Sequence, residues 1–120
     1  MTRLIVLVVE DEFLIRLHAA NMVEAAGFQA LTAENADDAI AILEARDDVR
    51  VIFTDIQMPG SMDGLKLAAA VRDRWPPIAI IATSAVNVRD KLPAGGRFIP
   101  KPYSLTEVEL HLREVTASQR

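Results

Sequence analysis

The segment Leu4-Ile5-Val6-Leu7-Val8-Val9 is apolar throughout and ends at three acids, Glu10-Asp11-Glu12. A short, fully apolar run is typical of a strand covered on both faces, as in a parallel sheet. Three later runs also end at a polar residue: Val51 to Thr54 ends at Asp55, Ile78 to Thr83 ends at Ser84, and Arg97 to Pro100 ends at Lys101. A weaker run, Gln29 to Thr32, has no reactive residue at its end.

Helical patterns separate these runs. Three polar residues precede such patterns and are predicted to cap helices, namely Asn35, Asp63 and Ser104. In the last helix we expect Leu105, Val108, Leu112 and Val115 to face the core. The fourth connection differs, because only Asn87 to Leu92 precede Pro93 and the pair Gly95-Gly96. Proline and glycine break helices, so this connection is predicted to hold a turn or two at most.

Strands that alternate with helices predict an α/β domain with a five-stranded parallel, doubly wound sheet. The weak second strand belongs at an edge, and right-handed connections with helices on both faces then favour the order 2-1-3-4-5, which is the flavodoxin-like order. In such sheets ligands bind at the carboxyl ends of the strands, near the switch point between strands 1 and 3. This order places Glu10, Asp11 and Asp55 together, with Ser84 and Lys101 along the same edge.

Composition narrows the class of protein. With 120 residues the chain is expected to form one domain, residues 1–120. The net charge is −4 and there is no basic cluster, so we expect no nucleic-acid partner. No cysteine is present, which excludes disulfides and thiolate chemistry. The apolar run at residues 4–9 is too short for a signal peptide or a membrane span, so a cytoplasmic protein with no membrane partner is the expectation.

Each polar residue alone has an ordinary explanation: acids at a helix start, a turn hydroxyl, a solvated lysine. Together they indicate phosphoryl chemistry. Three carboxylates in one pocket repel one another unless a cation neutralises them, and Mg²⁺ prefers oxygen ligands. A carboxylate such as Asp55 can accept a phosphoryl group. Ser84 and Lys101 can then bond and neutralise phosphate oxygens.

These residues, in this order, resemble a known family. Five segments carry the resemblance to the receiver domain of two-component response regulators: Val8-Val9-Glu10-Asp11-Glu12, Asp55-Ile56-Gln57-Met58-Pro59, Asp63-Gly64, Thr83-Ser84-Ala85 and Lys101-Pro102. The resemblance extends over the whole chain. It implies a phosphorylation-controlled regulator that accepts a phosphoryl group from a histidine kinase or a histidine phosphotransfer protein. It also implies a protein that is no enzyme beyond its own phosphorylation and dephosphorylation.

Site roles follow from the resemblance position by position. Asp55 matches the phosphoacceptor, Asp11 the acid that binds Mg²⁺ directly, and Glu10 its neighbour that acts through metal-bound water. Gln57 matches the residue that offers a backbone carbonyl to the metal. The switch hydroxyl matches Ser84, the switch aromatic matches Phe98, and the motif lysine matches Lys101. The family also implies a cis bond between Lys101 and Pro102.

Three features depart from the family pattern. The first acid is Glu10, where aspartate is commoner, and the acceptor loop from Met58 to Gly64 carries one residue more than usual. The connection from Ser84 to Lys101 is shorter than usual, so the fourth helix, part of the output surface, must be stunted or replaced by a loop. Only residues 103–120 follow the Lys-Pro motif, so we expect no output domain and an unidentified output protein as partner.

Two other functions remain open from the sequence. A phosphatase of the haloacid dehalogenase type also uses an aspartate nucleophile with Mg²⁺, but it needs a second aspartate where Gln57 stands. A pseudo-receiver would serve as a structural interaction module, but such domains usually lose the acceptor, the acids or the lysine. The sequence does not distinguish a binding switch from a phosphate shuttle.

Overall fold

The computed structural model describes residues 3–58, 60 and 62–117, in which strands and helices alternate. Pro59 and Ser61, two residues of the long acceptor loop, lie outside the described residues. The elements, in chain order, are β1 (Ile5–Val9), α1 (Phe13–Ala25), β2 (Gln29–Ala33), α2 (Ala36–Ala45), β3 (Val49–Asp55), α3 (Gly64–Arg74), β4 (Ala79–Ser84), the 3₁₀ helix η1 (Arg89–Lys91), β5 (Arg97–Pro100) and α4 (Leu105–Thr116).

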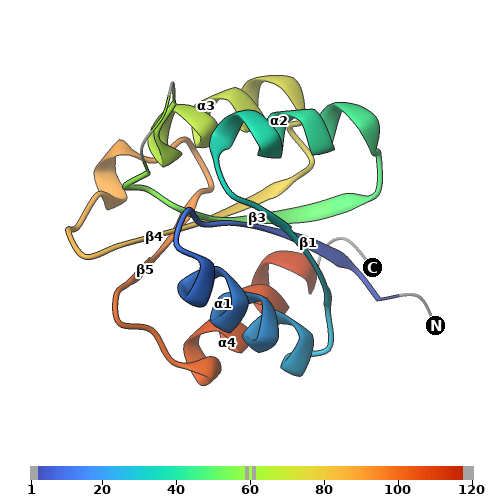
Figure 1. Cartoon of the computed structure of the whole chain (residues 1–120), viewed down its shortest axis with the longest axis vertical. Helices are drawn as coiled ribbons and strands as arrows, with labels where there is room; N and C mark the ends of the chain where they lie inside the picture. Colours follow the sequence, from blue (N-terminus) through green and yellow to red (C-terminus); the bar gives the residue numbers. More distant parts are fainter. Residues whose placement is uncertain (1–2, 59, 61, 118–120) are drawn as a thin grey trace.

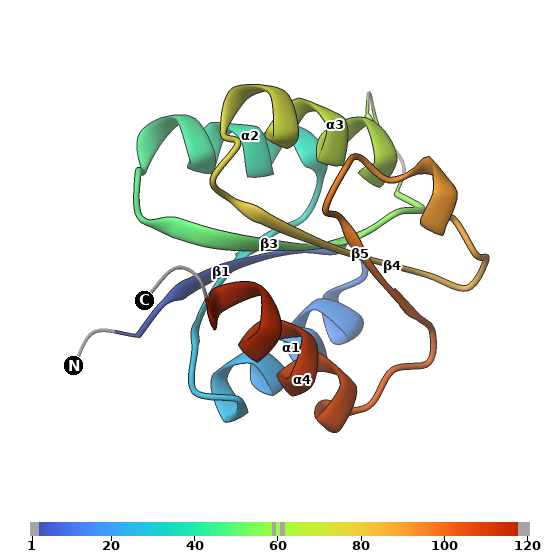
Figure 2. The same cartoon turned by 180° about the vertical axis from the view of Figure 1, so that it is seen from behind.

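The five strands form one parallel sheet in the order β2-β1-β3-β4-β5, which confirms the predicted topology. Helices α2 and α3 cover one face, and α1 and α4 cover the other (Figures 1 and 2). Every residue of β1 is buried, whereas the edge strand β2 is partly exposed. The strand that is apolar throughout its length is therefore the buried one, and the strand with polar residues is at the edge of the sheet.

The register brings the carboxyl ends of the strands to one edge. Val9 pairs with Thr54, and Asp55 pairs with Thr83. At the far end, Ser84 pairs with Pro100, so Lys101 follows directly. The residues that end four separate runs of sequence are thus aligned along one edge of the sheet.

The predicted helix caps are present. The side chains of Asn35, Asp63 and Ser104 accept hydrogen bonds from the backbone N–H groups of Asp38, Lys66 and Glu107. The prediction for Leu105 was wrong, because its side chain is 41% exposed. Leu105 is the first residue of α4, and the deeper positions Val108 and Leu112 fill the interface with the sheet.

The connection between β4 and β5 holds only the single turn η1, so the expectation of a stunted fourth helix is confirmed. A small apolar cluster fills the space beneath it, where Val88 packs with Ile56, Ala82 and Phe98. Arg72 of α3 ties down the end of this connection, since its Nε donates to the carbonyl of Ala94 at 3.1 Å. Within the described ranges, every helix is too short or too polar to span a bilayer.

Candidate phosphoacceptor site

Two acids lie directly after β1. The chain continues the sheet for one residue, because the N–H of Glu10 donates to the carbonyl of Ala33 at 3.1 Å. This extension buries the Glu10 side chain, which is 4% exposed, while Asp11 is exposed. Glu10 Oε2 accepts a hydrogen bond from the N–H of Glu12 at 2.9 Å. The Glu10 side chain is therefore enclosed within the site, whereas Asp11 lies at its solvent-exposed side.

Asp55 is the last residue of β3 and is 4% exposed. Its Oδ1 accepts a hydrogen bond from the N–H of Gln57 at 3.3 Å. The start of α3 packs against this strand end, because the N–H of Gly64 donates to the carbonyl of Ile56 at 2.9 Å. A Cβ on Gly64 would lie 2.2 Å from the carbonyl oxygen of Asp55. Only glycine permits this approach, which fixes the backbone beneath the Asp55 side chain.

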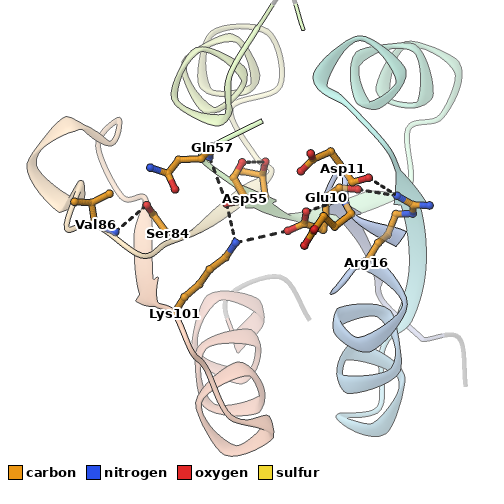
Figure 3. A network of polar contacts seen from close by, with 10 residues as sticks. Glu10, Asp11, Arg16, Asp55, Gln57, Ser84, Val86 and Lys101 are labelled. Carbon is orange, nitrogen blue, oxygen red and sulfur yellow. Dashed lines mark hydrogen bonds and ion pairs between the residues drawn. The ribbon is translucent and has the colours of Figure 1, made fainter. Parts of the chain in front are cut away.

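Lys101 connects the two buried acids. Its Nζ lies 3.2 Å from Asp55 Oδ1 and 3.7 Å from Glu10 Oε1 (Figure 3). The backbone of Lys101 is held by β4, since its N–H donates to the carbonyl of Ser84 at 3.0 Å. The following bond, Lys101-Pro102, is cis, as the family resemblance implied. The ammonium group thus enters the site from the end of β5 and partly neutralises its carboxylates.

Burial raises the pKa of Glu10 to about 7, and side-chain hydrogen bonding with Asp11 and the negative charge of Asp55 act in the same direction. The N–H of Glu12 and the ammonium of Lys101 act in the opposite direction, because both favour the ionised carboxylate. Desolvation outweighs these two contacts. A buried carboxyl group with a pKa near neutrality, next to specific charged partners, is typical of functional sites.

The donor set fits a hard divalent cation. Glu10, Asp11 and Asp55 each offer a carboxylate oxygen, and the three oxygens lie within 4.8 Å of one another. Oxygen ligands of this kind suit Mg²⁺, which keeps several water molecules and needs only one or two carboxylates. The arrangement supports the magnesium interpretation. The contribution of the Gln57 carbonyl remains a prediction.

Ser84 and Phe98 lie on the β4–β5 side of the site. Ser84 is fully buried, and its Oγ accepts a hydrogen bond from the N–H of Val86 at 3.1 Å (Figure 3). Phe98 is 6% exposed, and the guanidinium of Arg89 lies 5.3 Å from the centre of its ring. The hydroxyl is therefore bonded to the start of the connection that also covers the aromatic ring. The switch roles of both residues remain predictions.

Two arginines at the site were missed by sequence reasoning. Arg16 of α1 donates from Nη1 to the carbonyl of Glu10 at 2.9 Å and lies 3.4 Å from the carbonyl of Asp11 (Figure 3). Arg89 covers Phe98 from η1. Neither contact has a signal in the sequence, because one partner is backbone and the other is an apolar ring.

Comparison with known proteins identifies the class that this fold and site define. Residues 6–113 match the response regulator receiver domain family, so the chain belongs to this family of two-component signalling domains. Receiver domains generally bind Mg²⁺ at an acidic pocket and interact with histidine kinases and output domains. They are signalling domains rather than conventional enzymes.

Curated relatives include regulators and a kinase. The chain is 32% identical over 112 residues to the DNA-binding transcriptional regulator NtrC of Salmonella typhimurium, covering 89% of this chain and 24% of that protein. It is 30% identical over 120 residues to the sensor kinase CckA of Brucella abortus, covering 95% of this chain and 13% of the kinase. The chain therefore spans a quarter or less of these relatives.

Solved structures agree with the fold. The receiver domain of a hybrid histidine kinase CckA has a TM-score of 0.79 at 26% identity, with 92% of this chain and 97% of that chain covered. The Vibrio cholerae chemotaxis protein CheY4 has a TM-score of 0.83 at 24% identity, with 95% and 99% covered. These similarities confirm the flavodoxin-like receiver architecture.

Proposed function

We propose that residues 1–120 act as one cytoplasmic receiver unit that accepts a phosphoryl group on Asp55 and thereby changes its binding to a partner protein. One observation carries the proposal: the buried Asp55 carboxylate contacts Lys101 at 3.2 Å and shares a cluster of oxygens with Glu10 and Asp11. A nucleophile, a cation-binding set and a phosphate-binding ammonium therefore lie within one site.

The transfer begins with an oxygen of Asp55 attacking the phosphorus of a phosphohistidine. The phosphorus–nitrogen bond breaks, its electron pair stays on the imidazole, and the imidazole takes up a proton. Lys101 and the Ser84 hydroxyl hold the oxygens of the transferred group. Asp11, Asp55 and the Gln57 carbonyl would hold Mg²⁺, with Glu10 beside it, and the bound ion would neutralise charge on the phosphoryl oxygens. Attack of water on phosphorus later restores the carboxylate.

The partner that donates the phosphoryl group is proposed to be a histidine kinase or a histidine phosphotransfer protein. An exposed apolar patch on the first turns of α1 supports this, where Phe13, Leu14 and Leu17 are 64%, 74% and 47% exposed. The patch begins two residues after Asp11, so a protein seated on it reaches the site opening. Contiguous exposed apolar side chains commonly mark a protein-binding surface.

The test is phosphorylation with a small acyl phosphate and Mg²⁺, followed by intact mass measurement. We expect one added phosphoryl group that is stable in acid and lost in base, as an acyl phosphate is. Asp55→Asn should take up none, and a chelator should prevent labelling of the unsubstituted protein. Asp73→Asn, which alters an exposed acid on α3, is the matched control and should label fully. Full labelling of Asp55→Asn would refute the assignment.

A haloacid dehalogenase type phosphatase gains no support from the site. Gln57 stands two residues after the nucleophile, its side chain is exposed, and an amide cannot serve as a general acid. A pseudo-receiver is less favoured as well, because the acceptor, both acids and the lysine are brought together.

A further inference from the structure

Arg16 is not among the site residues that the sequence predicted, but it contacts the loop that carries two of them. Its Nη1 donates to the carbonyl oxygen of Glu10 at 2.9 Å, and the same nitrogen lies 3.4 Å from the carbonyl oxygen of Asp11. Its guanidinium carbon lies 5.6 Å from the centre of the Phe13 ring. The guanidinium is therefore fixed on one side by an aromatic face and on the other by the loop.

This loop needs support because it contains three consecutive acids. Glu10, Asp11 and Glu12 repel one another, and the bond from the Glu12 N–H to Glu10 Oε2 holds only the Glu10 side chain. The backbone of Arg16 adds a second tie, since its N–H donates to the carbonyl of Glu12 at 2.8 Å. Arg16 therefore contacts all three residues of the loop, two through its side chain and one through its main chain.

Carboxylates also lie near Arg16. Glu34 and Asp38 line a cavity of about 430 Å³ together with Arg16. The hydrogen bonds of Nη1 nevertheless go to backbone carbonyls of the acidic loop. The geometry indicates that the side chain holds the loop rather than forming a surface ion pair with Glu34 or Asp38.

We propose that Arg16 is a positioning residue for cation binding: it holds the backbone of Glu10 and Asp11 so that the Asp11 carboxylate faces the acceptor. The inference rests on the proposed function. Groups that orient metal ligands typically contribute 10-fold to 100-fold to metal affinity, and we expect the lower end, about 10-fold, because Arg16 holds the ligand's backbone.

The direction of the change in Mg²⁺ affinity distinguishes a positioning role of Arg16 from the effect of its positive charge. A cationic guanidinium beside a cation site repels Mg²⁺, so removing its charge alone would tighten binding. Loss of positioning weakens binding instead. Arg16→Ala removes both, and Arg16→Lys keeps the charge but replaces the planar fork with a single ammonium.

The experiment is a Mg²⁺ titration followed by backbone NMR shifts, with a parallel assay of phosphorylation by a small acyl phosphate. Arg16→Ala should raise the Mg²⁺ dissociation constant about 10-fold, and Arg16→Lys should raise it less. At saturating Mg²⁺ the phosphorylation rate of both variants should return to within about twofold of the unsubstituted protein, because the reacting groups are intact.

Arg113→Ala is the matched control, since Arg113 pairs with Glu109 on the surface of α4. It should leave the dissociation constant unchanged. Tighter or unchanged binding in Arg16→Ala would overturn the inference, as would a rate that stays low at saturating Mg²⁺. If Arg16→Ala does not fold, the same outcomes are read from Arg16→Lys. Failure of the unsubstituted protein to bind Mg²⁺ would instead count against the proposed function.

Discussion

Glu10 is a buried acid of the site whose pKa departs from its usual value. It stands where aspartate is commoner in the family, and its pKa is raised to about 7, chiefly by burial. A cation that enters the site therefore competes with a proton. Metal affinity and proton release are linked in such sites, because the ligands must be ionised.

We predict that Mg²⁺ affinity rises as the pH increases from about 5 to about 8. Below pH 7 the folded protein holds a proton on Glu10, and ionising it costs free energy that metal binding must supply. Above pH 7 that cost disappears. Titration calorimetry in buffers of different ionisation enthalpy would show proton release on binding at pH 6 and none at pH 8.5.

The control for this prediction is Glu10→Gln, which removes the titration while keeping the size of the side chain. Its Mg²⁺ affinity should depend less on pH than that of the unsubstituted protein.

In the presence of a chelator, the stability of the unsubstituted protein should fall as the pH rises from 4.5 to about 7, because the folded state binds more protons than the unfolded state in that window. Equal pH profiles in both proteins would contradict the interpretation.

The first residue of helix α3, Gly64, packs closely against the backbone at the end of strand β3. The carbonyl oxygen of Asp55 lies only 2.2 Å from the position that a Cβ on residue 64 would take. We predict that Gly64→Ala destabilises the fold by about 1–3 kcal/mol, the usual cost of overpacking. The displaced backbone should also slow phosphorylation of Asp55.

Urea unfolding and the small-donor assay would measure both effects. Ala69→Ser, an exposed change on the same helix, should shift stability by less than about 0.5 kcal/mol. A Gly64→Ala variant with unchanged stability and rate would show that the two elements can separate without cost.

The connection between β4 and β5 is held at each end by a hydrogen bond, and the bond at its start involves a predicted phosphate-binding group. Arg72 binds the carbonyl of Ala94 at one end. At the other, Val86 is held through the Ser84 hydroxyl, which is also the group predicted to bind phosphate. If that hydroxyl turns to the phosphoryl group, the N–H of Val86 loses its partner and the segment must rearrange.

We expect fast amide exchange at residues 87–95 in the free protein and slower exchange after phosphorylation, if the rearranged segment packs more firmly over Phe98 than it does in the free protein. Ser84→Ala should still accept phosphate but should not show the slowing. Exchange measured by mass spectrometry with Asp55→Asn as the unphosphorylated control checks this. Strong, equal protection in both states would eliminate a disorder-to-order switch.

The two largest apolar clusters of the described residues lie on opposite faces of the one sheet. Leu67 of α3 belongs to one layer and Leu112 of α4 to the other, and both are fully buried. The single tryptophan, Trp75, packs against the Leu67 layer. Fluorescence of Trp75 therefore reports on one face, whereas circular dichroism reports on every element.

Leu112→Ala should destabilise the protein by about 2–5 kcal/mol, the range for a buried leucine. Because both layers share the sheet, the midpoint seen by Trp75 fluorescence should fall as far as that seen by circular dichroism. Leu110→Ala, at a position of the same helix that is 53% exposed, should change stability by less than about 0.5 kcal/mol. Separate midpoints in Leu112→Ala would show that the two faces unfold independently.

Local sequence determined the elements and their order. The apolar runs, the caps at Asn35, Asp63 and Ser104, and the breakers Pro93 and Gly95 act through interactions within a few residues. The sheet order also followed, because handedness and coverage of both faces leave few alternatives. The predicted strand order therefore placed the motif residues along one edge of the sheet, although it did not predict the contacts between them.

Contacts between distant segments were decided only in the tertiary structure. Three features depend on how the helices lie on the sheet. They are the hydrogen bonds from Arg16 to two carbonyls, the contact of Arg89 with the Phe98 ring, and the exposure of Leu105. The shifted pKa of Glu10 belongs to the same group, since burial causes it. Sequence patterns report which side chains are apolar and how they repeat, whereas desolvation and backbone contacts depend on distances that only packing sets.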